Sequence, residues 1–165
     1  LDIGANIGTH SVILSKYFYK VYSFEPQKDV FKILKENIKI NNCKNVTINN
    51  FGLSDKNTTY KMKCFDKTKM TNIGGIGITN DENGCETIKT KTLDSLKINN
   101  IGFIKIDVEG HEYNALIGGI KTIKKNKPVI IFEEHNINSR VFKLLEKLNY
   151  HITRLSYSND YLAVQ

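Results

Sequence analysis

Glycine and polar residues at the start of the sequence have the types and spacing of a small-molecule site. Asp2, Gly4, Asn6 and Gly8 occur in the opening segment LDIGANIGTHS, between an apolar strand end and a helical pattern. Glycine permits a turn with positive φ or a close approach of backbone to ligand, and a helix N-terminus offers unpaired N–H groups to a negatively charged group. The segment therefore predicts a strand, a glycine turn and a helix that together hold a ligand.

A carboxylate at the end of the next apolar segment indicates the kind of ligand. Glu25 precedes the closing proline of VYSFEP, roughly 20 residues beyond Gly4, where an acidic side chain accepts hydrogen bonds from the hydroxyls of a ribose. The alternative is that Glu25 only favours the start of the following helix. The turn lacks the GxGxxG of a dinucleotide site, which favours S-adenosyl-L-methionine (SAM) as the cofactor. The ammonium group of SAM would meet Asp2, and the carboxylate of SAM would meet backbone N–H groups near Asn6 to Gly8.

Strand and helix patterns alternate along the chain that must position these residues. They predict a single α/β domain, residues 1–165, with a mostly parallel sheet, a strand at residues 46–53 and one helical pattern through residues 113–123. The last two strands, 151–156 and 160–165, are joined too tightly for a crossover helix and must be antiparallel. Residues 54–93 break the alternation and predict an inserted β-hairpin, with a plain solvent loop as the alternative.

Ligands of such sheets bind beyond the carboxyl ends of the strands. The strand ends that carry informative residues are 2–8, 24–26, 107–112 and 133–135.

Several segments of the chain resemble the FkbM family of SAM-dependent methyltransferases. In order, they are LDIGANIGTHS, SFEP, FGLSD, TLDSL and IKIDVEGHE, with VIIFEE beyond them. The resemblance implies the seven-stranded Rossmann-like sheet of class I methyltransferases with an antiparallel last strand, and O-methylation, often of hydroxyls on sugars, glycans or secondary metabolites. The residues that it assigns to the cofactor are Asp2, Gly4, Asn6, Gly8, Glu25 and, in the loop of residues 52–55 beside the adenine, Asp55. Because the family has a segment before the first strand, we expect the domain to be truncated at its N-terminus.

Catalytic candidates lie at the ends of two later strands. Methyl transfer to an alcohol needs in-line placement and a base that takes the hydroxyl proton. Asp107 and Glu109 are the candidates for contacts with cofactor and acceptor, and His111 or Glu133 for the base. We expect Lys105 to pair with a carboxylate and keep it ionised. The competing interpretation is structural, because carboxylates near a helix N-terminus stabilise its dipole without catalysis.

A divalent metal is an alternative role for the acidic residues. Asp107, Glu109 and Glu133 offer hard oxygen ligands. Nothing in their spacing fixes a coordination geometry, so no metal site is predicted.

The charge of the chain raises a second class of acceptor. The net charge is +7, with 24 Lys and Arg, of which only Arg140 and Arg154 are arginine. The lysines are spread along the chain and form no arginine cluster, which argues against a nucleic-acid partner. We therefore expect a small-molecule or glycan acceptor, in a pocket lined by Asn72, Gly74 and Gly75. A nucleic-acid methyltransferase and a non-catalytic SAM-binding module are the alternative functions.

Cysteine usage and hydropathy bear on location. Cys43, Cys64 and Cys85 are widely spaced, without a CxxC pair, and predict free thiols in the cytoplasm or another reducing compartment. No apolar run in the sequence is long enough to predict a membrane span.

Overall fold

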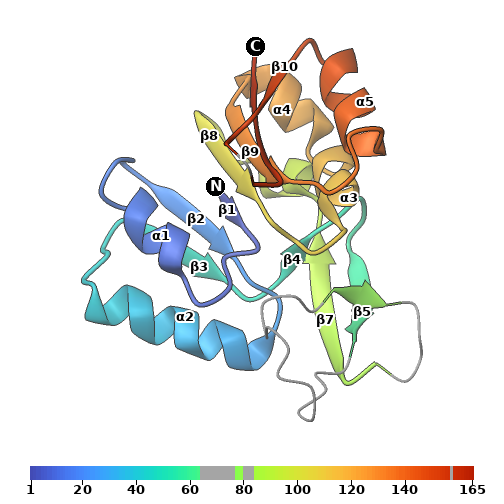
Figure 1. Ribbon diagram of the computed structural model, residues 1–165. Coiled ribbons are helices and arrows are strands. Elements are labelled where there is room, and N and C mark those ends of the chain that lie inside the picture. Colours follow the sequence, from blue (N-terminus) through green and yellow to red (C-terminus); the bar gives the residue numbers. More distant parts are fainter. Residues whose placement is uncertain (64–76, 80–83, 157) are drawn as a thin grey trace.

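A seven-stranded sheet forms the centre of the molecule (Figure 1). The computed structural model describes residues 1–63, 77–79, 84–156 and 158–165. The strand order is β10-β11-β9-β8-β1-β2-β3, and β1 pairs in parallel with both β2 and β8. β11 is antiparallel to β9 and β10, which confirms the predicted sheet. The strands are β1 (Asp2–Ile3), β2 (Val21–Phe24), β3 (Val46–Asn49), β8 (Phe103–Ile106), β9 (Val129–Glu133), β10 (His151–Arg154) and β11 (Asp160–Val164).

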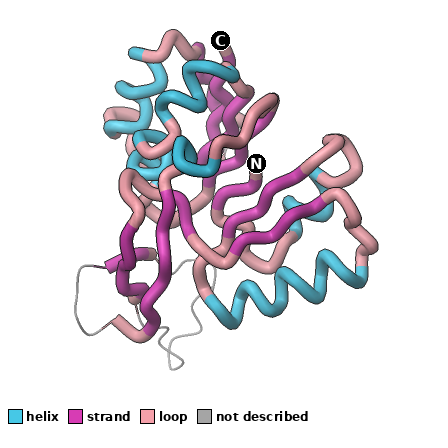
Figure 2. The backbone as a smooth tube through the Cα atoms, turned by 180° about the vertical axis from the view of Figure 1, so that it is seen from behind, coloured by secondary structure: helices cyan, strands magenta, loops and turns pink. Residues whose placement is uncertain are grey.

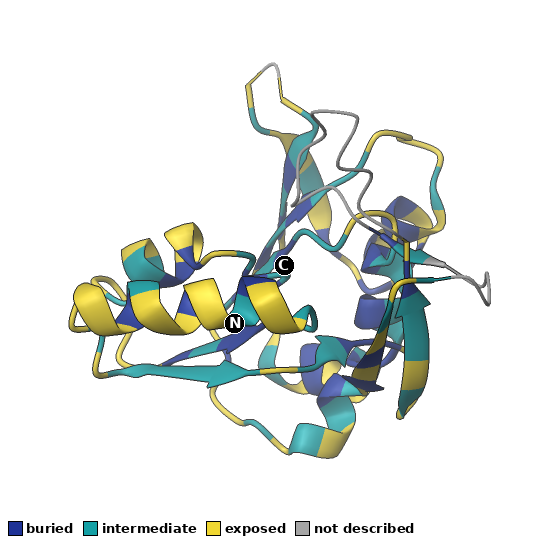
Figure 3. Cartoon of the chain, turned by 90° about the horizontal axis from the view of Figure 1, so that it is seen from below, coloured by how far each residue is buried: buried dark blue, intermediate teal, exposed yellow. Residues whose placement is uncertain are grey.

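Helices pack against the two halves of this sheet. α1 (Thr9–Leu14) and α2 (Lys28–Ile40) lie beside β2 and β3, whereas α3 (Glu112–Ile117), α4 (Ile120–Asn126) and α5 (Arg140–Lys147) lie with β8 to β11 (Figure 1). α2 buries Val30, Leu34 and Ile38, which are spaced four apart on one face. Its opposite face is exposed in Figure 3. The helical spacing of the apolar residues in the sequence therefore matches a helix that buries one face and exposes the other.

The predicted helical pattern through residues 113–123 is two helices, because close packing breaks it at a glycine pair. A Cβ on Gly118 would lie 1.8 Å from the carbonyl oxygen of Ser54, and one on Gly119 would lie 2.8 Å from Cδ2 of Leu93. Leu93 opens a short 3-10 helix, Leu93–Leu96. The chain therefore bends where a neighbouring segment comes too close for any side chain.

The core consists of two clusters of buried side chains. Strands β8 and β9 contribute Ile104, Ile106, Ile130 and Phe132 to the larger cluster, and each is at most 1% exposed. The smaller cluster joins Leu34 of α2 to the turn after β1. Burial of these side chains stabilises the edge of the sheet from which the loops emerge.

A second sheet lies below the first (Figures 1 and 2). Its order is β4-β7-β5-β6, with β4 (Gly52–Leu53), β5 (Thr58–Met62), β6 (Ile78–Thr79) and β7 (Glu86–Lys91). β5 and β7 are antiparallel, as the predicted hairpin requires. The predicted strand 46–53 is wrong in extent, because β3 pairs with β2 while β4 pairs with β7. Asn72, Gly74 and Gly75 lie outside the described residues.

Cysteine chemistry differs from the prediction at one position. Cys43 is free, but Cys85 is disulfide-bonded, so the prediction of three free thiols is wrong. Cys64 lies outside the described residues. The expectation of a reducing compartment rested on free thiols, and the disulfide at Cys85 removes that argument at this position. Across the part of the chain that the structure describes, no helix has both the length and the apolarity needed to cross a membrane.

Candidate active site

A cavity of about 260 Å³ opens at the carboxyl ends of the central strands. The loops after β1, β2 and β8 and the end of β9 contribute its polar wall, and the second sheet contributes an apolar wall. The predicted residues that line it are Gly4, Asn6, Glu25, Asp107, Glu109, His111 and Glu133. Parallel strands end at one edge, so residues from distant parts of the sequence meet there.

Gly4 allows two loops to touch. Its φ is +81°, and a Cβ there would lie 1.8 Å from the carbonyl oxygen of Asp107. Asn6 also has a positive φ, 50°. Gly8 does not line the cavity; a Cβ there would lie 2.6 Å from Cδ1 of Leu34. The glycine turn therefore combines a close approach near the cavity with packing on α2 behind it.

Asp2 lies behind the cavity wall rather than in it. It is fully buried, its Oδ2 accepts a hydrogen bond from Ser11 Oγ at 2.5 Å, and Ser11 Oγ lies 2.8 Å from Ser23 Oγ. Asp2 Oδ1 makes no hydrogen bond within the described residues, and Lys105 Nζ lies 3.9 Å away. Asp2 is therefore buried beneath the loop and does not line the cavity.

Glu25 is 4% exposed and held by two backbone donors. The N–H of Asn6 donates to Oε2 at 3.0 Å, and the N–H of Gln27, at the start of α2, donates to Oε1 at 2.8 Å. Desolvation raises the pKa of Glu25 to about 7, although these hydrogen bonds act in the opposite direction. Both oxygens retain lone pairs for a ligand hydroxyl. The helix-start interpretation and the ligand interpretation are therefore compatible.

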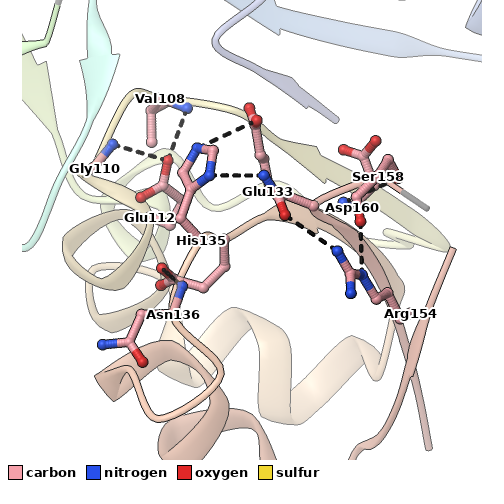
Figure 4. A network of polar contacts seen from close by, with 11 residues as sticks. Val108, Gly110, Glu112, Glu133, His135, Asn136, Arg154, Ser158 and Asp160 are labelled. Atoms are coloured by element: carbon pink, nitrogen blue, oxygen red, sulfur yellow. Dashed lines mark hydrogen bonds and ion pairs between the residues drawn. The ribbon is translucent and has the colours of Figure 1, made fainter. Parts of the chain in front are cut away.

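Three carboxylates meet at the ends of β8 and β9. Lys105 Nζ lies 3.1 Å from Asp107 Oδ2, which confirms the predicted pairing. Burial first, and then the negative charge of Asp107, raise the pKa of both Glu109 and Glu133. Glu133 Oε1 also lies 3.5 Å from His135 Nε2 (Figure 4). The cavity therefore presents negative charge on this side. Within the described ranges, no group of three or more His, Cys, Asp or Glu residues is arranged to hold a metal ion.

The turn between β8 and α3 is held by Glu112. Its Oε1 accepts hydrogen bonds from the N–H groups of Val108 at 3.2 Å and Gly110 at 3.1 Å (Figure 4). Glu109 and Gly110 both have positive φ, 51° and 86°. A non-glycine residue in this conformation marks a loop that its surroundings fix. Glu112 is thus a structural residue that presents Glu109 and His111 to the cavity.

His111 is shared between the first cavity and a second one of about 360 Å³. Its Nε2 lies 2.9 Å from Ser54 Oγ, and its ring meets Tyr60 edge to face with 5.6 Å between centroids. Desolvation lowers the pKa of His111, against the opposite effect of the Asp55 charge. The imidazole is therefore neutral near pH 7 and able to accept a proton.

Asp55 lines the second cavity and does not line the first. Its Oδ1 accepts hydrogen bonds from Ser54 Oγ at 2.9 Å and Tyr60 Oη at 3.4 Å. Sequence reasoning did not single out Ser54 or Tyr60. Their proximity to His111 depends on β4 and β5 pairing with β7, which no local pattern encodes.

Comparisons with known proteins agree with this geometry. The Methyltransferase FkbM domain family matches residues 2–158. Hexuronic acid methyltransferase AglP of Haloferax volcanii is 30% identical over 168 residues, which cover 98% of this chain and 67% of AglP.

Solved structures share the fold. A methyltransferase FkbM from Methylobacillus flagellatus KT has a TM-score of 0.72 at 18% identity, covering 99% of this chain. The match covers 42% of that protein, so this chain spans about two-fifths of its length. A putative methyltransferase from Streptococcus mutans in complex with SAH has a TM-score of 0.54 at 11% identity, covering 98% of this chain and 84% of that one.

The strand order, with its antiparallel β11, and the cavity at the carboxyl edge define the Rossmann-like fold of the class I methyltransferases. Within that class, the chain belongs to the FkbM methyltransferase family, which matches almost its whole length.

Proposed function

We propose that this domain transfers a methyl group from SAM to a hydroxyl of a sugar or similar hydroxylated acceptor. SAM occupies the first cavity and the acceptor occupies the second. The observation that carries the proposal is the position of His111, a neutral imidazole that lines both cavities. A base at such a junction can reach a hydroxyl that points from one cavity toward the other.

The residues of the first cavity fit the chemical groups of SAM. Gly4 leaves room where a side chain would clash, and Glu25 has free lone pairs for the ribose hydroxyls. Leu53 and Ile88 offer apolar surface for the adenine, and the nearby carboxylates, Asp107 among them, favour a positively charged ligand. When bound, SAM supplies a methyl group on a sulfonium cation.

The second cavity has the composition of a site for a polyhydroxylated ring. Asp55, Lys56 and Asn114 supply hydrogen-bonding groups, and Tyr60 supplies an aromatic ring. The relative AglP is a hexuronic acid methyltransferase, which supports a sugar acceptor.

We assign the base to His111 rather than Glu133. Glu133 lines only the first cavity and lies 3.5 Å from His135 Nε2, whereas His111 faces the second cavity as well. A neutral imidazole accepts a proton near pH 7, and such assistance contributes roughly a hundredfold to ten-thousandfold to the rate.

Calorimetry with SAM and an assay for S-adenosylhomocysteine test the proposal. We expect micromolar SAM binding and turnover with hexuronic-acid or neutral oligosaccharides. His111→Ala should lower turnover at least about a hundredfold with unchanged SAM affinity, while His151→Ala, at an exposed position of β10, should behave as wild type.

Three results would contradict the proposal. Absence of binding heat would reject the cofactor. Binding without turnover on any hydroxylated acceptor would identify a non-catalytic module, and methylation of RNA or DNA instead of sugars would identify a nucleic-acid methyltransferase.

A further inference from the structure

A serine outside the predicted site links a carboxylate to His111. Ser54 Oγ lies 2.9 Å from Asp55 Oδ1 and 2.9 Å from His111 Nε2, and Ser54 is fully buried. The three side chains therefore form a chain of hydrogen bonds whose far end is the imidazole.

The direction of these hydrogen bonds follows from the chemistry of the first member. Desolvation opposes ionisation of Asp55, but hydrogen bonds from Ser54 and Asn114 outweigh it and lower the pKa, so Asp55 is a carboxylate at neutral pH. A carboxylate can only accept hydrogen bonds. The Ser54 hydroxyl must therefore donate to Asp55, which leaves a lone pair of Ser54 Oγ facing His111. His111 Nε2 must then carry a hydrogen.

The second ring nitrogen of His111 is consequently the basic one. A neutral imidazole carries one hydrogen, so a protonated Nε2 leaves Nδ1 with a free lone pair. Nδ1 makes no hydrogen bond with any residue in the described ranges. Its lone pair is therefore the site on the neutral ring that can take a further proton.

The fold places Ser54 rigidly. Its N–H donates to the carbonyl oxygen of Lys91 at 2.9 Å, which continues the pairing of β4 with β7. Its own carbonyl lies so close to Gly118 that a Cβ there would be 1.8 Å away. The segment after β4 is therefore held at both ends of α3, by the hydrogen bond to His111 at its start and by the close contact with Gly118 at its end.

We propose that Asp55 and Ser54 are positioning residues that hold His111 in the tautomer with a bare Nδ1, the atom that takes the proton of the acceptor hydroxyl. The inference rests on the proposed function for the role of that proton. As the O–H bond breaks, the proton passes to Nδ1, the oxygen forms the new bond to the methyl carbon, and the electron pair of the S–C bond stays on sulfur. Asp55, acting through Ser54, then stabilises the imidazolium that forms.

Nitrogen-15 NMR of the full chain with labelled histidine, without cofactor, tests the tautomer directly. At a pH where His111 is neutral, Nδ1 should resonate as an unprotonated nitrogen and Nε2 as a protonated one, and His111→Gln identifies the signals. In Ser54→Ala and in Asp55→Asn, we expect a mixture of tautomers, because neither variant dictates which nitrogen is protonated. Ser95→Ala, at an exposed serine of the 3-10 helix, should leave the tautomer unchanged.

Turnover provides a second measurement. Ser54→Ala should lower kcat roughly tenfold to a hundredfold with little change in SAM affinity, and Asp55→Asn should act in the same direction. A protonated Nδ1 in the wild type, or the wild-type tautomer in both variants, would overturn the inference. If no acceptor is methylated, the proposed function fails, while the tautomer is still decided by NMR.

Discussion

Replacing Glu25 by Gln should remove most of one pH-dependent contribution to stability. Burial raises the pKa of Glu25 from 4.5 to about 7. Between these values the folded protein holds a proton that the unfolded chain has released, so the free energy of unfolding falls as the pH rises. The contribution is fully present below about pH 4.5 and is lost as the pH passes about 7.

The size of this effect follows from the pKa difference. Each pKa unit corresponds to about 1.4 kcal/mol, so from about pH 5 to about pH 8 the wild type should lose about 2 kcal/mol more stability than Glu25→Gln. Glu36→Gln is the matched control, because Glu36 is exposed on α2 and the substitution removes the same charge.

Urea denaturation followed by circular dichroism at several pH values measures the difference. The control should follow the wild type across the range. A constant difference between wild type and Glu25→Gln at all pH values would refute the reasoning, because Glu25 would then titrate alike in the folded and unfolded chains.

The same carboxylate should control SAM affinity. A hydrogen bond to a charged group contributes about 1.5 to 3 kcal/mol, so Glu25→Gln should weaken SAM binding roughly tenfold to a hundredfold above about pH 7. Wild-type affinity should improve as the pH rises toward about 7, since ribose hydroxyls donate to the ionised form. Calorimetry that shows equal affinities for both proteins would reject the ribose assignment.

Three further substitutions test the framework of the site. Gly4→Ala places a Cβ 1.8 Å from the Asp107 carbonyl and should cost at least about 2 kcal/mol and abolish SAM binding, whereas Gly102→Ala, with nothing within 4 Å, should be nearly neutral in urea denaturation. Leu34→Ala removes a fully buried side chain from α2 and should cost about 3 kcal/mol, measured in the same way. Lys105→Met leaves the buried Asp2 without its positive partner and should cost about 3 to 5 kcal/mol at neutral pH; equal stability would disprove the pairing.

The sequence predicted the residues at the carboxyl edge well because the physics there is local and repetitive. Alternating strands and helices build a parallel sheet, and a parallel sheet brings its strand ends together. Gly4, Glu25, Asp107 and His111 therefore line one cavity although they are far apart in the chain. The expectation that Lys105 pairs with a carboxylate also held, and the structure identifies the partner as Asp107, just beyond the end of β8.

The positions that the sequence did not predict depend on long-range pairing. Residues 46–53 read as one strand, yet Gly52 and Leu53 pair with β7, about 40 residues away. That exchange of sheets places Asp55 in the lining of the second cavity and Ser54 against His111. The break at Gly118 has the same origin, since only the folded chain brings the Ser54 carbonyl against α3.

The sequence by itself determined the class of sheet, the glycine turn, the acidic strand ends and the resemblance to FkbM methyltransferases, because periodicity and short motifs are properties of neighbouring residues. Only the tertiary structure decided which of these groups face the cavity. Burial keeps Asp2 away from the cavity surface and raises the pKa of Glu25. Contact between the second sheet and the loop after β8 gave His111 its hydrogen-bond partner Ser54. Desolvation and hydrogen bonding depend on neighbours that a residue meets only after folding, which is why neither could be predicted from the sequence.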